Sequence, residues 1–110
     1  MAKNPAPSRE QAAASVRYDA RELARLFEIS PRQLQRKFNR YLKRSPQDWL
    51  NEQRIIAARR LLLSGGTVKE VAFELGFKQV SHFCRQFKTY HRMTPSQFIH
   101  WKLKLRVAGR

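Results

Sequence analysis

The side chains that usually carry catalysis or bind metals are scarce in this chain, whereas cationic side chains are abundant. Cys84 is the single cysteine, which excludes an intrachain disulfide and a cysteine-rich zinc site. His82, His91 and His100 recur every nine residues, a spacing that turns successive side chains on a helix by roughly 180°. In contrast, 23 Lys and Arg oppose 8 Asp and Glu, for a net charge of +15. This charge balance predicts an anionic partner. Because the cysteine count and the histidine spacing do not suit a metal site, no metal or other cofactor is expected.

The positive charge is concentrated in two regions of the chain. Residues 1–44 hold 11 basic and 4 acidic residues and residues 67–110 hold 9 and 2, whereas residues 45–66 hold only 3 and 2. A generally solvated cationic surface does not predict this symmetry. An anionic membrane is a competing polyanion, but the sequence has no run of about 18 apolar residues and no apolar signal region. We therefore expect a cytoplasmic protein without a membrane partner.

Capping boxes mark the expected helix starts. In each box an N-cap oxygen is followed three residues later by a carboxylate or amide, and together they satisfy backbone donors of the first helical turn. A weaker box pairs Ser8 with Gln11, and three of the others place proline at the first helical position. The five stronger boxes are Asp19 with Glu22, Ser30 with Gln33, Ser45 with Asp48, Thr67 with Glu70, and Thr94 with Gln97.

Apolar residues behind these caps follow helical spacing, and no segment alternates in the manner of a strand. The sequence therefore predicts an all-α fold of six or seven helices, in which Gly65 and Gly66 end a long central helix. Trp49 is expected in the core under that helix. The apolar residues at helical spacing are Leu23, Ala24, Phe27, Leu34, Phe38, Leu50, Ile56, Leu61, Val71, Ala72, Leu75, Phe83 and Phe87.

An internal repeat organises these helices. Aligning residues 22–24 with residues 70–72 places Phe27 on Leu75 and Ile29 on Phe77. After one extra residue in the second copy, residues 34, 36 and 38 fall on residues 83, 85 and 87. Each copy therefore predicts a helix, a short turn, a second helix and the cap of a further helix, which is the outline of a helix-turn-helix. An α-solenoid needs about three copies or more, and only two are present.

The two copies resemble the tandem helix-turn-helix units of the AraC/XylS family of bacterial transcription regulators. The first copy is ELARLFEISPRQLQRKF, from Glu22 to Phe38, and the second is EVAFELGFKQVSHFCRQFKTYHRMTPSQF, from Glu70 to Phe98. Between them, WLNEQRIIAARRLLL resembles the linker helix of the family. The resemblance extends from about residue 19 to residue 99. It implies two helix-turn-helix subdomains joined by a long linker helix.

The resemblance also implies a role for each matched position. Arg36 and Arg85 are the repeat-related pair, and a guanidinium group matches guanine O6 and N7 in a bidentate manner. Leu34, Phe38, Phe83 and Phe87, which lie between the polar residues at helical spacing, are expected in the core. The expected base-contacting residues are Arg32, Gln33, Gln35, Arg36, Val80, Ser81, His82 and Arg85. The expected phosphate-contacting residues are Lys37, Arg40, Lys43, Lys78, Lys88 and Arg92.

The chain departs from the family pattern where each second helix should end in a left-handed turn. The family usually has glycine there, whereas this chain has Lys43 and Arg92. Because both replacements are cationic, we hypothesise that phosphate contacts compensate for the backbone strain. Glu28 likewise occupies a turn position where glycine is common, while Gly76 is retained. The stretch before Asp19 does not match the full first helix of the family.

These features predict a protein that binds double-stranded DNA sequence-specifically and regulates transcription. A stiff linker helix would set the two recognition helices for successive major-groove segments roughly 34 Å apart, so that a monomer reads an asymmetric site. The family implies activation through RNA polymerase, and it places ligand sensing in a separate domain, so no small-molecule ligand is expected in this chain. The expected segments are a flexible start that includes a short helix (1–18), a first helix-turn-helix (19–44), a linker helix (45–64), a second helix-turn-helix (67–99) and a basic tail (100–110).

Two other classes of protein are alternatives to this interpretation. A sequence-independent, architectural nucleic-acid binder would account for the charge but does not require matched arginines in a repeat. An enzyme that uses Cys84 as its nucleophile is the third alternative, because DNA-repair methyl acceptors can carry such a helix-turn-helix. No acid or base lies at usable spacing from Cys84, so we expect no enzymatic activity. The position of Trp101, beyond the matched region, is not predicted.

Overall fold

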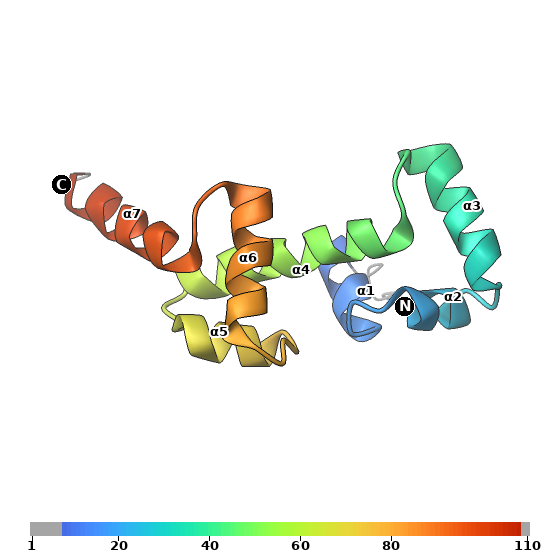
Figure 1. Cartoon of the computed structure of the whole chain (residues 1–110), viewed down its shortest axis with the longest axis horizontal. Coiled ribbons are helices and arrows are strands. Elements are labelled where there is room, and N and C mark those ends of the chain that lie inside the picture. Colours follow the sequence, from blue (N-terminus) through green and yellow to red (C-terminus); the bar gives the residue numbers. More distant parts are fainter. Residues whose placement is uncertain (1–7, 109–110) are drawn as a thin grey trace, which may run out of the picture. The chain divides into compact units, whose positions relative to one another are not determined.

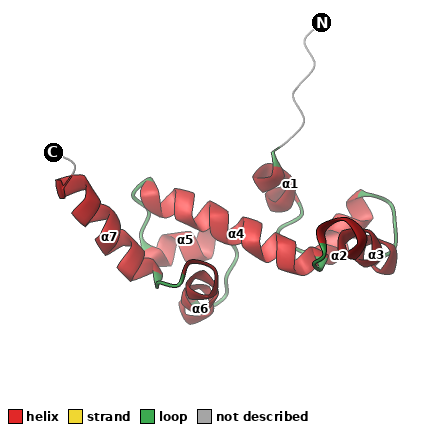
Figure 2. Ribbon diagram, turned by 90° about the horizontal axis from the view of Figure 1, so that it is seen from above, coloured by secondary structure: helices red, strands yellow, loops and turns green. Residues whose placement is uncertain are grey.

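The computed structural model describes residues 8–108, with side chains through Leu105, and within this range every regular element is a helix (Figure 2). The predicted all-α fold is therefore confirmed. Residues 1–7 of the expected flexible start lie outside the described residues. The helices, labelled in Figure 1, are α1 (Arg9–Ser15), α2 (Ala20–Leu26), α3 (Pro31–Leu42), α4 (Pro46–Leu63), α5 (Val68–Glu74), α6 (Val80–His91) and α7 (Pro95–Ala108).

The chain divides into two compact units, and the boundary falls between Arg54 and Ile55, inside α4. Unit 1 contains α1, α2, α3 and the first half of α4. Unit 2 contains the second half of α4 and α5, α6 and α7. The segment expected as a linker thus supplies residues to both units. Residues 100–108, expected as a basic tail, continue α7.

The predicted caps form at the helix starts. Ser30 Oγ accepts a hydrogen bond from the Gln33 backbone N–H at 3.1 Å, and the Ser30 N–H donates to Gln33 Oε1 at 2.9 Å. The boxes that begin at Ser8, Thr67 and Thr94 are reciprocal in the same way. Asp19 caps α2 from one side, because its carboxylate accepts two backbone N–H groups while its own N–H donates to the Val16 carbonyl.

Unit 1 packs around the start of α4. Gln47 accepts a hydrogen bond from the Ala20 N–H at 3.1 Å and donates to the Tyr18 carbonyl at 2.9 Å, so one side chain ties α4 to the turn between α1 and α2. Trp49 is half-buried and meets the half-buried Phe38 edge to face, with centroids 5.7 Å apart. The buried residues of this unit include Ala13, Val16, Leu23, Ala24, Leu34 and Leu50.

One apolar residue of unit 1 that follows helical spacing is not buried. Phe27 lies 56% exposed. Helix α2 ends at Leu26, and Phe27 is its C-cap, with φ −86° and ψ 0°. Because the helix stops there, Phe27 does not continue the buried face formed by Leu23 and Ala24.

Unit 2 has a core of aromatic rings. Phe83 contacts both Phe77 and Phe87, with centroids 5.2 and 5.8 Å apart, and Phe87 continues to Phe98 at 5.7 Å. Such tilted and edge-to-face pairs add roughly 0.5 to 1.5 kcal/mol each beyond the burial of their surface. Lys102 fastens α7 to the end of α4, because its Nζ donates to the Leu62 carbonyl at 2.9 Å.

The repeat extends further than the sequence alignment predicts. At the end of α1, Arg17 N–H donates to the Ala14 carbonyl and Tyr18 N–H to the Ala13 carbonyl. The end of α4 makes the same pair of bonds through Gly65 and Gly66. The two units also share an edge-to-face pair between their third and fourth helices, at 5.7 Å and 63° in unit 1 and at 5.7 Å and 62° in unit 2. Helix α1 therefore takes the place in unit 1 that the end of α4 takes in unit 2, although the sequence before Asp19 does not match the first helix of the family.

Candidate nucleic-acid interface

The turn between the two helices of each helix-turn-helix has the same backbone in both units. In unit 1, Ile29 N–H donates to the Ala24 carbonyl at 3.1 Å, and Phe77 N–H donates to the Ala72 carbonyl at 2.9 Å in unit 2. Glu28 takes a φ of 58°, where the second unit has Gly76 at 83°. The first turn therefore keeps the left-handed geometry although it lacks glycine.

Helix α3 presents nearly all of its polar side chains to solvent. Leu34 is its one buried residue and Phe38 is half-buried, so the helix packs through a narrow stripe. All residues predicted on α3 and at its end are exposed, so the whole set is accessible to a partner. These residues are Arg32, Gln33, Gln35, Arg36, Lys37, Arg40 and Lys43.

The capping box limits what Gln33 can offer to a base. A glutamine that pairs with adenine donates to N7 and accepts from the N6 amino group. Gln33 Oε1 already accepts from the Ser30 N–H at 2.9 Å. This bond occupies one lone pair of Gln33 Oε1 and fixes the side chain against the start of α3, whereas Gln35 makes no capping bond.

Helix α6 exposes the corresponding face in unit 2. Ser81, His82 and Arg85 are exposed, and Val80 is half-buried. The expected phosphate-contacting residues of this unit are exposed as well, namely Lys78, Lys88 and Arg92. Cys84 lies on the same helix and is half-buried. Within residues 8–108 no three His, Cys, Asp or Glu side chains are grouped closely enough to hold a metal ion.

A hollow of about 350 Å³ lies at the start of α6, lined by Lys78, Gln79, His82 and Arg85. The His82 ring meets the buried Phe77 edge to face, with centroids 5.3 Å apart and planes at 84°. This contact restricts the orientation of the imidazole at the hollow. Gln79 was not among the contact residues predicted from the sequence. The available signal was that glutamine is a poor N-cap residue, yet it stands directly before the helix.

Helices α3 and α6 both end in the left-handed turn expected from the family resemblance. Lys43 has φ 58° and ψ 31°, and Arg92 has φ 60° and ψ 19°. Their backbone N–H groups donate to the carbonyls of Asn39 and Lys88, at 3.2 and 2.7 Å. Two cationic side chains therefore occupy a conformation that favours glycine, at equivalent places in the two units.

The basic side chains of α3 and α6 are not neutralised within the protein. The described ion pairs join Arg25 to Glu22, at 3.3 Å, and Arg44 to both Asp48 and Glu52, at 2.8 and 3.2 Å. Across the described residues, none of the predicted contact residues forms an ion pair. The sequence has no Asp or Glu after residue 74. Both faces are thus available to an external anion.

His91 contributes no positive charge to this face at neutral pH. The pKa of His91 is lowered mainly by burial and further by the positive charge of Arg59. A hydrogen bond with the Ile55 backbone raises this pKa, but by less than the other two effects lower it. The ring lies 4.6 Å from the Phe87 ring, and Nε2 is buried without a hydrogen-bond partner. His91 is therefore a half-buried residue of unit 2 whose surroundings favour the neutral ring.

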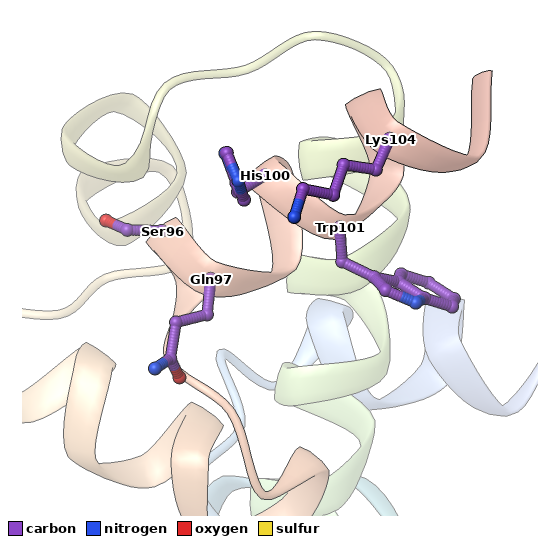
Figure 3. Close-up of a pocket in the computed structure, with 5 residues that line it drawn as sticks. All are labelled: Ser96, Gln97, His100, Trp101 and Lys104. Carbon is purple, nitrogen blue, oxygen red and sulfur yellow. The ribbon is translucent and has the colours of Figure 1, made fainter. Parts of the chain in front are cut away.

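A second hollow, of about 430 Å³, lies along α7 and is shown in Figure 3. Five side chains of this one helix line it: Ser96, Gln97, His100, Trp101 and Lys104. Trp101 is 48% exposed and tilts against Phe98, with centroids 5.9 Å apart. Trp101, whose position was not predicted from the sequence, therefore covers one edge of the aromatic core.

No helix in the described range has the length and apolar character needed to cross a membrane.

Residues 23–100 match a family model described as a helix-turn-helix domain. The chain is 34% identical over 71 residues to the regulatory protein PocR of Salmonella typhimurium, covering 64% of this chain and 23% of PocR. It is 37% identical over 78 residues to the transcriptional regulator GbdR of Pseudomonas aeruginosa, covering 70% and 21%. It is 35% identical over 74 residues to the transcriptional activator RhaS of Salmonella arizonae, covering 66% and 27%. The chain thus spans about a quarter of the length of these relatives.

Solved structures share the fold. A DNA-binding transcriptional dual regulator from Escherichia coli K-12 superposes with a TM-score of 0.73 at 24% identity, covering 94% of this chain and 99% of that one. An AraC-type transcriptional regulator from Chromobacterium violaceum gives 0.72 at 24% identity, covering 83% and 88%. The C-terminal domain of the response regulator yesN from Fusobacterium nucleatum gives 0.69 at 27% identity, covering 79% and 89%.

Proposed function

Because the chain belongs to the helix-turn-helix family of AraC-type DNA-binding domains, we propose that it binds double-stranded DNA sequence-specifically and regulates transcription. Helices α3 and α6 are the recognition helices of this proposal. Their exposed side chains contact base edges in the major groove, and the basic side chains beside them contact phosphates. The three relatives given above are named as a regulatory protein, a transcriptional regulator and a transcriptional activator.

One observation carries the proposal: the two units repeat the same turn and the same exposed arginine. Arg36 and Arg85 occupy equivalent positions on α3 and α6, and both are exposed. A guanidinium group can donate two parallel hydrogen bonds to guanine O6 and N7. A protein that binds DNA through charge alone requires neither the matched position nor a residue capable of bidentate pairing.

The proposal includes simultaneous binding of both recognition helices by one monomer. The helices would enter successive major-groove segments roughly 34 Å apart. Since α3 and α6 differ in sequence, the two half-sites differ as well. Hydroxyl-radical footprinting on a selected site should show two protected segments about one helical turn apart. Protection of a single segment would contradict this arrangement.

Selection of bound duplexes from a random library tests the specificity. We expect Arg36→Ala and Arg85→Ala each to relax base preference in a different half of the site and to cost about 1 to 3 kcal/mol of binding free energy. Arg25→Ala is the control, because Arg25 is an exposed arginine on α2 that pairs with Glu22. It should leave the preferred sequence unchanged. Uniform weakening by the two α3 and α6 variants, with no loss of preference, would assign both arginines to the phosphate backbone.

We extend the proposal to activation of transcription through contact with RNA polymerase. Its support is that the relative RhaS is named a transcriptional activator. Transcription in vitro with purified RNA polymerase, on a promoter that carries the selected site, should increase when the protein is added. A decrease that follows occupancy of the site would identify a repressor instead.

The net charge of +15 favours one alternative, a sequence-independent nucleic-acid binder. Competition separates the two functions. A specific regulator prefers its own site over bulk DNA by about 10³-fold or more at physiological salt, whereas a charge-driven binder does not.

A further inference from the structure

Gln79 departs from the way in which the other helices of this chain begin. The N-cap side chains of α1, α2, α3 and α5 all accept hydrogen bonds from the backbone of their own helix. Gln79 is the N-cap of α6, with φ −132° and ψ 134°, and its side chain makes no capping bond. Serine, threonine, aspartate and asparagine are the residues that cap well. A local rule that is broken at one site, with no gain within the fold, is typical of a functional residue.

The Gln79 side chain instead lines the hollow of about 350 Å³ at the start of α6. The other three residues there are Lys78, His82 and Arg85, so the hollow joins a carboxamide to an ammonium, an imidazole and a guanidinium group. All four residues are exposed, and the sequence carries no carboxylate beyond residue 74. The lining therefore contains groups that donate to an electron-rich ligand, and Gln79 is the member whose donor and acceptor lie side by side on one planar carboxamide.

The start of α3 in unit 1 differs from the start of α6, because its N-cap residue forms a capping box. Ser30 holds the equivalent N-cap position, and Gln33 is equivalent to His82 in the aligned repeat. Ser30 and Gln33 bind each other through bonds of 2.9 and 3.1 Å. In unit 2 neither position is engaged in a cap, and the His82 ring is held against Phe77. Two polar side chains that unit 1 uses for folding are thus released in unit 2.

We propose that Gln79 is a specificity-determining residue, and that its carboxamide reads an adenine next to the guanine bound by Arg85. This inference rests on the proposed DNA-binding function. Glutamine pairs with adenine by donating to N7 and accepting from N6, whereas Arg85 supplies two donors to guanine. Lys78 holds the adjacent phosphate as a point charge. The ligand of the hollow is therefore a purine step in duplex DNA.

The test compares wild type, Gln79→Ser and Gln79→Glu by selection from a random duplex library. Gln79→Ser introduces a residue that caps α6 and removes the base-reading group. We expect it to lower adenine preference at one position about ten-fold, while the thermal midpoint of unfolding rises by roughly 4 °C. Gln79→Glu keeps the length of the side chain but only accepts hydrogen bonds, so the preferred base at that position should change to cytosine.

The opposite effects on specificity and stability distinguish base reading from a structural role. Retention of full adenine preference in Gln79→Ser would overturn the inference. Equal weakening on every sequence would overturn it as well, because it would place Gln79 on the phosphate backbone. If wild type selects no sequence at any position, the proposed DNA-binding specificity itself fails. If wild type selects a sequence that the two variants leave unchanged, only the role of Gln79 fails.

Discussion

Replacing the two cationic residues at the ends of the recognition helices should stabilise the protein and weaken its binding to DNA. Lys43 and Arg92 have φ values of 58° and 60°, in the left-handed region. The strain of a side chain there is about 1 to 2 kcal/mol, and the added freedom of glycine in the unfolded chain offsets about 0.5 to 1 kcal/mol. Lys43→Gly and Arg92→Gly should each raise the free energy of unfolding by about 0.5 to 1 kcal/mol.

The expected effect on DNA binding comes from counterion release. Each phosphate contact contributes about 0.9 to the slope of log affinity against log salt concentration. Over a roughly four-fold change in salt, from about 50 to 200 mM, one contact makes affinity fall about 3.5-fold further. The Lys43→Gly and Arg92→Gly variants should each lose that increment of salt dependence and bind more weakly at low salt.

Fluorescence anisotropy with a labelled duplex, measured across this range of salt, gives the slope for each variant. Glu28→Gly is the matched control, because Glu28 has a φ of 58° but carries the opposite charge. It should stabilise the protein to a similar extent without reducing the salt slope. If Lys43→Gly and Arg92→Gly bind as tightly as wild type at low salt, phosphate contacts do not account for these two residues. If Glu28→Gly gives no increase in stability, the estimate of backbone strain is wrong.

Three further predictions concern stability. Gly66→Ala should cost about 1 to 3 kcal/mol, because its Cβ would lie 2.9 Å from Val71 Cγ2; a double-mutant cycle with Val71→Ala in chemical denaturation should show a cost smaller than the sum. The lowered pKa of His91, caused by burial and then by Arg59, means that its stabilising effect is present above about pH 6.5 and is lost as the pH falls through the folded-state pKa. The midpoint of unit 2, followed through Trp101 fluorescence in a Trp49→Phe background, should therefore drop on acidification, and less so with His91→Phe. Phe83→Ala should cost about 3 to 5 kcal/mol, whereas Phe27→Ala, at an exposed position, should change stability by no more than about 0.5 kcal/mol; equal losses in urea unfolding would contradict the described core.

Features formed by neighbouring residues could be predicted from the sequence. The reciprocal box between Ser30 and Gln33 spans three residues, and its two hydrogen bonds form as the pattern predicts. The left-handed turns at Lys43 and Arg92 were expected from the resemblance to the AraC/XylS family, which usually has glycine at both places, and they are confirmed. A helix end requires a fixed local hydrogen-bond pattern, so these positions depend little on the rest of the chain.

Features that depend on contacts between distant residues could not be predicted. Residues 100–108 continue α7, and Lys102 in this segment donates to the carbonyl of Leu62, 40 residues earlier. Phe27 has helical spacing but is exposed, since α2 ends one residue before it. Gln79 was not among the predicted contact residues, because a poor N-cap residue before α6 does not by itself show that a hollow lies beside it.

The sequence alone determined where most of the helices begin, how the chain repeats and that its net charge of +15 favours an anionic partner. These properties follow from short-range hydrogen bonding, apolar periodicity and net charge, which act through neighbouring residues or through composition. Only the tertiary structure decided which groups surround a polar side chain once the helices have packed. Lys102 donates to the carbonyl of Leu62, 40 residues earlier, and the His82 ring is held against the buried Phe77 beside the hollow that Gln79 lines. Such contacts depend on groups brought close by folding, whereas the cap between Ser30 and Gln33 forms between residues three apart in the chain.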